Sequence, residues 1–296
     1  MDRVSAAGNA LLIMYAWDMC DASLHDIPPK QLDPRMARSG WNIVGFLSGS
    51  DDIIRSGAGI RSSVLGASDD AANRVCYGYV AEQNGQVVAV IRGTDGAEEW
   101  GDDLDFLMMA HPNPAGGLVD QGFWSIYRTM WFHPVAGGSN PGIAEGITAA
   151  AAGKPVRVLG HSLGAALGTY LALDLKLAGC AASACLFASP RTGNGTFVSF
   201  FDRTVNNYDL FNYARDIVPT VPQFDVLHLS NYADLPQAKT IPPDASVVQI
   251  TNEIRCNHHL ICYTALLDMP TYRQAMADPA CTDDDRNCAK CVLLPA

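Results

Sequence analysis

A short motif near the middle of the chain places a serine between two glycines. The stretch VRVLGHSLGAALG (156–168) contains a Gly-x-Ser-x-Gly pattern centred on Ser162. An apolar run leads into the motif and an alanine-rich run leads out, which is typical of a tight turn between a buried strand and a helix. Gly160 and Gly164 lack the side chains that would collide at such a turn. We therefore predict that Ser162 is a nucleophile, rather than an ordinary serine that caps a glycine-rich loop.

Three histidines follow the serine and are candidates for its general base. A serine hydroxyl is a weak nucleophile at its own pKa and needs a histidine to take its proton. His228 lies in a stretch that reads as a strand (225–230), where a structural histidine is the better interpretation. His258 and His259 follow the last predicted strand and open the last predicted helix. From the residues alone, either of these two can serve as the base.

An aspartate at the end of a predicted strand is the candidate for orienting that histidine. Asp216 comes directly after the strand predicted over residues 209–215. Carboxylates just beyond the C-terminal end of a strand in a parallel sheet project into the ligand-binding crevice. Pro219 and Pro222 stiffen the loop that follows. We therefore predict that Asp216 belongs to the site, and the alternative is a solvated loop aspartate.

Two backbone N–H groups are candidates for holding a developing oxyanion. Leu163 begins the predicted helix after the serine, where N–H groups lack intrahelical partners and the helix dipole is positive. Thr94 follows the strand predicted over residues 86–93 and can offer both its N–H and its hydroxyl. The Gly-Thr-Asp-Gly stretch around Thr94 also reads as a plain turn.

Strands that alternate with helices must position these residues. Residues 75–82 and 86–93 predict a β-hairpin, because Asn84 and Gly85 supply a turn between two β-branched runs. The alternation that follows indicates a mainly parallel central sheet with helices on both faces. The other predicted strands are 155–160, 183–189, 209–215, 225–230 and 246–251, the predicted helices are 5–22, 121–132, 142–152, 163–178, 194–203 and 258–268, and residues 97–120 read as irregular.

Composition limits the classes of protein to which the chain can belong. Its 296 residues are 48% hydrophobic and 17% charged, enough to bury a large core, and no composition break divides residues 1–296 into two domains. The net charge of -11 argues against a nucleic-acid partner. No apolar run reaches the roughly 18 residues of a transmembrane helix. The N-terminal stretch reads as an amphipathic helix rather than a signal peptide, so the residues leave the localisation undefined.

Nine cysteines include a cluster in the C-terminal tail. The stretch CTDDDRNCAKC (281–291) has Cys-x6-Cys-x2-Cys spacing. A structural zinc site needs four ligands, usually in two pairs, so zinc is the weakest of three interpretations. The other two are a disulfide staple and free thiols. We expect no metal and no organic cofactor, because the predicted chemistry needs neither.

Five segments of the chain resemble the class 3 lipases, the fungal-lipase-like branch of the α/β-hydrolases. Together with the histidine region they span about residues 75 to 265. Each segment alone is a weak signal, and their combination is specific. The segments are VVAVIRGT (87–94), DQGFWSIY (120–127), VLGHSLGAALG (158–168), FASPRTGNGTF (187–197) and NYARDIVPTVP (212–222).

The resemblance assigns roles to individual residues. It implies an α/β-hydrolase fold in which Ser162 is the nucleophile and Asp216 is the acid of a catalytic triad. Thr94, after Arg-Gly, matches the family's oxyanion residue, with Leu163 as the second donor.

The resemblance also selects between the two adjacent histidines. Many members place the base five residues before a tyrosine that begins an apolar helical turn, which here matches His258 before Tyr263. Some fungal members use a shorter spacing, and this keeps His259 as the alternative.

The implied function is that of a serine carboxylester hydrolase acting on acylglycerols or other fatty-acyl esters at an oil–water interface. A lid-like segment around residues 95–118 and a Cys-rich tail (281–296) complete the predicted domain. The stretch GAEEWGDDLDF (96–106) is strongly acidic for a lid, which favours shorter or more polar esters. A short-chain or feruloyl-type esterase is therefore the alternative, followed by a non-catalytic binding protein on the same fold.

Overall fold

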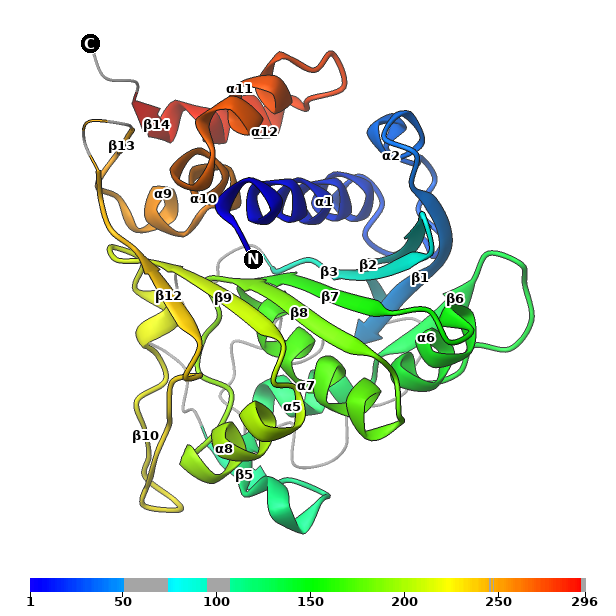
Figure 1. Ribbon diagram of the computed structural model, residues 1–296, viewed down its shortest axis with the longest axis vertical. Coiled ribbons are helices and arrows are strands. Elements are labelled where there is room, and N and C mark those ends of the chain that lie inside the picture. The colour runs from blue at the N-terminus through cyan, green and yellow to red at the C-terminus, as the bar shows by residue number, and fades with distance from the viewer. Residues whose placement is uncertain (51–73, 95–106, 245, 247, 294–296) are drawn as a thin grey trace.

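The computed structural model describes residues 1–50, 74–94, 107–244, 246 and 248–293 (Figure 1). Its main sheet consists of β1 (Asn42–Ser50), β2 (Arg74–Gln83), β3 (Gln86–Ile91), β6 (Trp131–Pro134), β7 (Val156–His161), β8 (Ala182–Phe187), β9 (Tyr208–Tyr213) and β12 (Ala238–Ile241). Three small sheets pair β4 (Met108–Ala110) with β5 (Leu118–Asp120), β10 (Phe224–Asp225) with β11 (Ser230–Asn231), and β13 (Gln249–Ile250) with β14 (Val292–Leu293). The α-helices are α1 (Arg3–Asp21), α2 (Pro34–Arg38), α5 (Gln121–Arg128), α6 (Ile143–Ala151), α7 (Leu163–Leu177), α8 (Gly195–Thr204), α9 (Ile254–His258), α10 (Leu260–Leu267), α11 (Met269–Ala277) and α12 (Asp283–Cys288), and the 3-10 helices are η4 (Pro114–Gly116), η5 (Val218–Thr220) and η6 (Ala289–Cys291).

The order of strands in the main sheet is β12-β9-β8-β7-β3-β2-β1-β6. The pairings from β3 to β12 are parallel, and those from β3 to β6 are antiparallel. The expected hairpin is confirmed, since β2 and β3 pair around a turn with Asn84 and Gly85 at positive φ. The parallel strands bring their C-terminal ends to one edge, where the predicted site residues are located.

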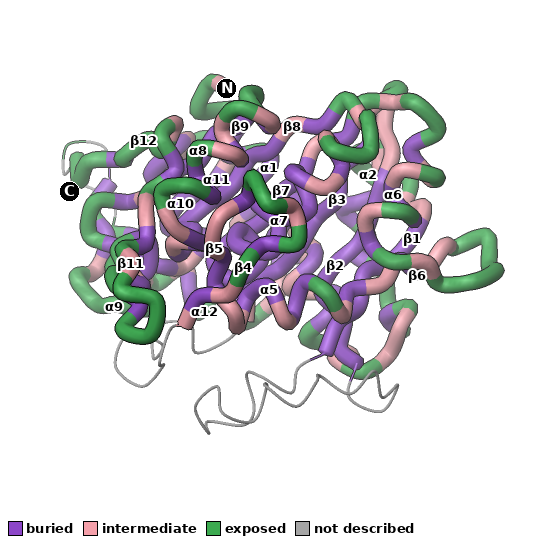
Figure 2. Tube along the Cα trace, turned by 90° about the horizontal axis from the view of Figure 1, so that it is seen from below, coloured by how far each residue is buried: buried purple, intermediate pink, exposed green. Residues whose placement is uncertain are grey.

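Helices cover both faces of the sheet, as the alternation of elements predicts (Figure 1). Because successive side chains of a strand point to opposite faces, β2 places Val80 in one hydrophobic core and Tyr79 in the other. The first core lies between the sheet and α5, α6, α7 and α8. The second lies between the sheet, α1 and α10. Figure 2 shows that the central strands are buried, whereas exposed residues lie in the surrounding turns and helices.

The first helix confirms the helical interpretation of the N-terminal stretch. Asp2 caps α1 by accepting a hydrogen bond from the Ser5 N–H at 2.8 Å. The helix then packs between the sheet and α10, with ten of its residues buried. Among the described residues, no helix has the length and apolarity of a membrane span.

The helix predicted over residues 121–132 is wrong beyond Arg128. From Trp131 the chain forms β6, which pairs antiparallel with β1 and sets Phe132 opposite Leu47. Local periodicity does not reveal this pairing, because β1 lies about eighty residues earlier in the sequence. The glycines and serines of β1 hide its own pattern, and a Cβ at Gly45 would lie 2.2 Å from the Phe132 ring.

The strand predicted over residues 225–230 is also wrong. β10 ends at Asp225, whose Oδ1 accepts hydrogen bonds from the N–H groups of Leu227 at 2.7 Å and His228 at 3.2 Å. Such side-chain-to-backbone bonds compete with a strand ladder and favour a turn. His228 therefore lies at the tip of a hairpin and not within a strand.

The predicted lid-like segment (95–118) lies outside the described residues between 95 and 106. The sequence predicts the rest of this segment to be irregular, but it contains regular secondary structure. Residues 108–120 form a hairpin, in which β4 and β5 pair around η4.

Candidate active site

Ser162 lies on the sharp turn between β7 and α7. Its backbone has φ 57° and ψ -127°, a left-handed conformation that is disfavoured for a residue with a side chain. The Ser162 N–H donates to the Phe187 carbonyl of the adjacent strand β8 at 3.0 Å, and its carbonyl accepts from the Ala165 N–H at 2.9 Å. The sheet and the helix together hold the serine in this conformation.

The two glycines of the motif are required by backbone contacts. A Cβ at Gly160 would lie 2.2 Å from the carbonyl oxygen of Gly164, in the first turn of α7. A Cβ at Gly164 would lie 2.2 Å from the carbonyl oxygen of Ile91 and 2.5 Å from that of Arg92. Glycine at both positions thus lets α7 begin directly against β7 and the end of β3.

The ring of His258 lies between Ser162 and Asp216. Its Nε2 is 2.8 Å from Ser162 Oγ, and its Nδ1 is 2.8 Å from Asp216 Oδ2. Because a carboxylate only accepts hydrogen bonds, Nδ1 carries the proton and Nε2 is the acceptor for the serine hydroxyl. All three residues are buried. This arrangement can pass the serine proton to the imidazole.

Asp216 lies just beyond the end of β9 and is held by two further donors. The Val218 N–H donates to Oδ1 at 3.0 Å, and the Tyr263 hydroxyl donates to Oδ2 at 2.7 Å. The Tyr263 oxygen in turn accepts from the Tyr213 N–H at 2.8 Å. Burial, assisted by the Asp216 charge, raises the pKa of Tyr263 well above its usual value, so the phenol remains a neutral donor.

Tyr263 is a site residue whose contact the sequence does not reveal. Its spacing of five residues after His258 serves as a landmark of the resemblance, but a spacing does not indicate what the hydroxyl contacts. The structure places Tyr263 in α10, behind the aspartate and buried from solvent.

His259 caps α10. Its Nδ1 accepts the Ile261 N–H at 3.2 Å. Burial lowers the pKa of His259 to about 4, and the nearby Arg255 and His258 contribute to the shift. Of the two adjacent histidines, His258 is the one within hydrogen-bond distance of Ser162.

His161, between Gly160 and Ser162, is a second buried histidine that sequence reasoning missed. Its Nε2 donates to the backbone carbonyl of His258 at 2.8 Å, and the two ring centroids are 4.8 Å apart. Burial lowers the pKa of His161 well below its usual value, and proximity to His258 adds to this. A neutral His161 can thus hold the His258 backbone without placing a second positive charge beside the catalytic ring.

The end of β3 passes directly beside the nucleophile. A Cβ at Gly93 would lie 3.1 Å from the Cβ of Ser162, a tight contact that the glycine avoids. Thr94 follows, and with His258 it lines the cavity beside the site. Leu163 is the first residue of α7, where the N–H has no intrahelical acceptor. Leu163 is therefore adjacent to Ser162 in the chain, and Thr94 follows a glycine that lies close to Ser162.

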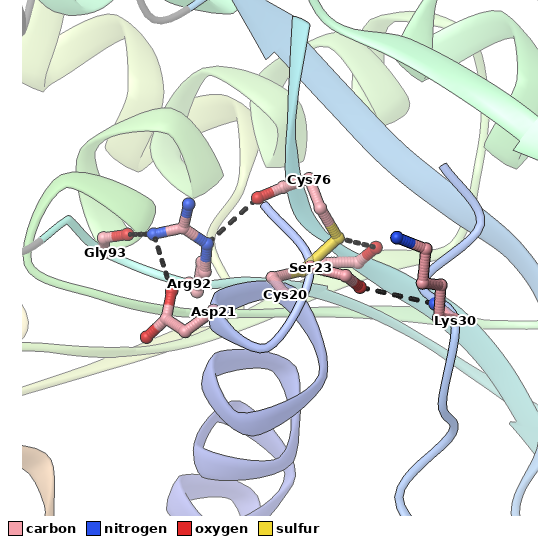
Figure 3. Close-up of a disulfide and its surroundings, with 8 residues drawn as sticks. Cys20, Asp21, Ser23, Lys30, Cys76, Arg92 and Gly93 are labelled. Atoms are coloured by element: carbon pink, nitrogen blue, oxygen red, sulfur yellow. Dashed lines mark hydrogen bonds and ion pairs between the residues drawn. A yellow bond between two sulfur atoms is a disulfide. The ribbon is translucent and has the colours of Figure 1, made fainter. Parts of the chain in front are cut away.

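Arg92 fixes the segment that leads to Thr94. Its Nε donates to the Cys76 carbonyl at 2.9 Å, and its Nη1 donates to the Gly93 carbonyl at 2.8 Å (Figure 3). Nη1 also lies 3.7 Å from the Asp21 carboxylate at the end of α1. A disulfide between Cys20 and Cys76 joins the same helix end to β2.

A cavity of about 950 Å³ opens beside these residues. One part of its wall is Thr94 and His258, and another is Trp17 of α1. The C-terminal tail supplies polar wall residues, among them Asp284 and Lys290. The cavity can therefore take a group that is partly apolar and partly hydrogen-bonding.

The C-terminal tail is tied to the histidine segment. A disulfide joins Cys291 to Cys256, two residues before His258, which confirms the staple interpretation for Cys291. Cys281 and Cys288 are free thiols. Within the described part of the chain, no group of three or more His, Cys, Asp or Glu side chains is arranged to hold a metal ion.

Three features define an α/β-hydrolase fold. The sheet is mainly parallel, a strained serine lies between a strand and a helix, and an aspartate and a histidine follow later strands. The sequence model of the family described as lipase (class 3) matches residues 88–226. Over these residues the chain is similar to the class 3 lipases.

Two curated relatives and one solved structure illustrate the relationship. A secreted mono- and diacylglycerol lipase A of Penicillium cyclopium is 32% identical over 154 residues, which are 49% of this chain and 46% of the relative. A lipase of Rhizopus niveus is 31% identical over 209 residues, which are 66% of this chain and 50% of the relative. The chain thus spans about half the length of these relatives. The structure of a triacylglyceride lipase of Rhizomucor miehei has a TM-score of 0.54 at 19% identity, covering 80% of this chain and 78% of that one, and this likeness concerns the fold.

Proposed function

We propose that the protein is a serine carboxylester hydrolase that cleaves acylglycerols or other fatty-acyl esters through an acyl-enzyme intermediate. The observation that carries the proposal is the position of the His258 ring, 2.8 Å from Ser162 Oγ on one side and 2.8 Å from Asp216 on the other. Similarity to the class 3 lipases over residues 88–226 and the names of the relatives support the same reaction.

In the proposed mechanism, Ser162 Oγ attacks the ester carbonyl while His258 Nε2 takes its proton. The N–H groups of Thr94 and Leu163 hold the oxyanion of the tetrahedral intermediate. His258 then donates its proton to the departing alcohol, which leaves Ser162 acylated. Asp216 keeps the imidazole in the required tautomer and stabilises its charged form. Water, activated by His258, releases the fatty acid and regenerates the serine.

We also propose that residues 1–296 form one domain, with a lid-like segment around residues 95–118. Support comes from the two hydrophobic cores, which share one sheet and draw on helices from both ends of the described chain.

A short-chain or feruloyl-type esterase is the second candidate function. It is favoured by the polar part of the cavity wall, which includes Asp18, Asp284 and Lys290. Esters of one alcohol with acyl chains of increasing length separate the two candidates. Rising kcat/KM toward long chains favours the acylglycerol hydrolase, and a maximum at two to four carbons favours the esterase.

The test of the proposed function is hydrolysis of dissolved p-nitrophenyl butyrate by matched serine variants. Ser162→Ala is expected to lower kcat by about 10⁶-fold, as loss of a triad nucleophile does in serine hydrolases. Ser189→Ala removes another buried serine, whose hydroxyl contacts the Pro190 carbonyl, and should retain activity. Turnover by the Ser162→Ala variant at the wild-type rate would refute the assignment.

A further inference from the structure

The hairpin of β10 and β11 presents four apolar side chains to solvent. Phe224, Val226, Leu227 and Leu229 are 45%, 72%, 67% and 80% exposed, and we call these four residues the tip patch. Single exposed apolar residues are common on protein surfaces, but a local group of them marks an interaction site. In Figure 1 the hairpin extends at the lower left, beyond the main sheet.

A buried carboxylate holds the tip in a fixed shape. Asp225 Oδ1 accepts from the N–H groups of Leu227 and His228, and Oδ2 accepts from the Met108 N–H at 2.8 Å. Oδ2 also lies 2.7 Å from Nδ1 of His228. The backbone that carries the patch is thus held in place before any partner arrives, which reduces the entropy lost on binding.

The most exposed residue of the patch also has a disfavoured backbone. Leu229 has φ +47°, a conformation that is uncommon for a bulky residue. Strain of this kind persists where the surrounding structure imposes it, often at functional sites. Here the fold holds a leucine outward at a position where a glycine or asparagine would be easier to accommodate.

The hairpin belongs to the same connection as Asp216. Ile217, directly after that aspartate, is 47% exposed, and Phe224 begins β10 only a few residues later. Arg191 stiffens the connection by donating from Nη1 to the Thr220 carbonyl at 2.8 Å. A surface that engages the tip patch is therefore coupled through a short, braced segment to the candidate triad.

We propose that the tip patch docks the protein on the surface of a neutral-lipid droplet, an inference that rests on the proposed function. A stable protein partner buries about 800 Å² per side, more than four side chains at a hairpin tip provide by themselves. A lipid surface requires no complementary shape and accepts aliphatic side chains individually.

The charges of the tip patch and of the whole chain indicate that the lipid surface is uncharged. The tip patch contains no charged side chain, and the carboxylate of Asp225, which lies between Phe224 and Val226 in the chain, is fully buried. The chain as a whole carries a net charge of -11 and is repelled by anionic membranes. An uncharged acylglycerol surface does not repel the negatively charged protein, and no charged side chain of the tip patch has to enter it.

Flotation with trioctanoin droplets tests the proposal. All proteins carry Ser162→Ala, so that binding is measured without turnover. The test variant adds Leu227→Ser and Leu229→Ser, and the matched control adds Val135→Ser and Leu177→Ser. The two control residues are 60% and 49% exposed and lie outside the hairpin, next to β6 and at the end of α7. Thermal unfolding verifies that every variant is folded.

The proposal predicts that the test variant binds droplets at least about tenfold more weakly, because two leucines no longer enter the lipid, whereas the control changes less than about twofold. Equal binding by both variants would overturn it. So would wild-type affinity for vesicles of pure phosphatidylcholine equal to that for droplets, since a bilayer would then be the partner.

A second readout separates this proposal from the proposed function. With Ser162 restored, the tip variant should hydrolyse dissolved p-nitrophenyl butyrate at the wild-type rate and lose activity only on emulsified trioctanoin. Equal losses on both substrates would overturn the docking role. A wild-type protein that floats with droplets but cleaves no ester would overturn the proposed function and leave the docking surface supported.

Discussion

Replacing Tyr263 by phenylalanine tests how the candidate acid is held. The substitution removes only the hydroxyl, which donates to Asp216 Oδ2 at 2.7 Å and accepts from the Tyr213 N–H at 2.8 Å. The ring itself is fully buried between His161 and Phe187, and phenylalanine preserves that packing. The consequences therefore come from two lost hydrogen bonds.

The size of the effect follows from those two bonds. A hydrogen bond to a charged group contributes about 1.5–3 kcal/mol, and a buried N–H left without an acceptor costs about 1–3 kcal/mol. Because the two effects share one hydroxyl, we expect the free energy of unfolding to fall by about 2–4 kcal/mol in total. Asp216 retains the Val218 N–H and His258, so kcat should fall by about tenfold rather than by the roughly 10⁴-fold of a lost triad aspartate.

Urea unfolding and hydrolysis of p-nitrophenyl butyrate measure these two effects. Tyr272→Phe is the matched control, because its hydroxyl makes only a long contact of 3.5 Å with the Ala289 carbonyl. That variant should lose less than about 0.5 kcal/mol and keep its kcat. If Tyr263→Phe matches the wild type in both stability and kcat, the reasoning about Asp216 is refuted.

Three further predictions concern the turn, a buried histidine and a disulfide. Gly164→Ala sets a Cβ 2.2 Å from the Ile91 carbonyl oxygen, so it should lower the free energy of unfolding by about 3 kcal/mol or prevent folding. In the control Gly195→Ala the new Cβ meets no atom within 4 Å, and its stability should be nearly unchanged. Similar urea midpoints for the two variants would contradict this. Since burial lowers the pKa of His259 from 6.5 to about 4, the unfolded chain binds more protons between these values, and stability falls as the pH drops from 6.5 to 4. His259→Asn keeps the cap acceptor and should reduce that fall by about 3 kcal/mol, and an unchanged difference between urea unfolding at pH 7 and at pH 4 would contradict it. Replacing Cys256 and Cys291 together by serine opens a 35-residue loop and should lower stability by about 2–4 kcal/mol, measured by thermal unfolding under non-reducing conditions; an unchanged Tm would contradict a stabilising staple.

Elements with a strong local pattern could be predicted from the sequence. The β2–β3 hairpin and β7 have β-branched runs, β8 is a short apolar run, and α7 and α8 have helical spacing; the structure has all of them. β1 and β6 were missed or misread because they are specified by pairing with each other across the sheet. The hairpin at residues 224–231 was misread as a strand because its alternating apolar residues point to solvent, while the buried Asp225 sets the turn.

The residues of the candidate site also differ in whether a local sequence pattern reveals them. Ser162 and Asp216 could be proposed from motifs, since a glycine-flanked turn and a strand end are local features. The choice of His258 over His259 needed a family resemblance, because adjacent residues share the same local sequence. Tyr263 and His161 could not be predicted as contacts, since their hydrogen bonds reach across 47 and 97 positions of the chain.

The most direct test of the central claim is mapping the site of reaction with a fluorophosphonate probe by peptide mass spectrometry. The probe forms a stable adduct with a serine that an adjacent base activates. The account predicts one adduct, on the peptide that contains Ser162, with labelling slowed by at least about a hundredfold in His258→Ala and unchanged within about twofold in His259→Asn. An adduct on another serine, or labelling that His258→Ala does not slow, would contradict the assignment of Ser162, His258 and Asp216 as a catalytic triad.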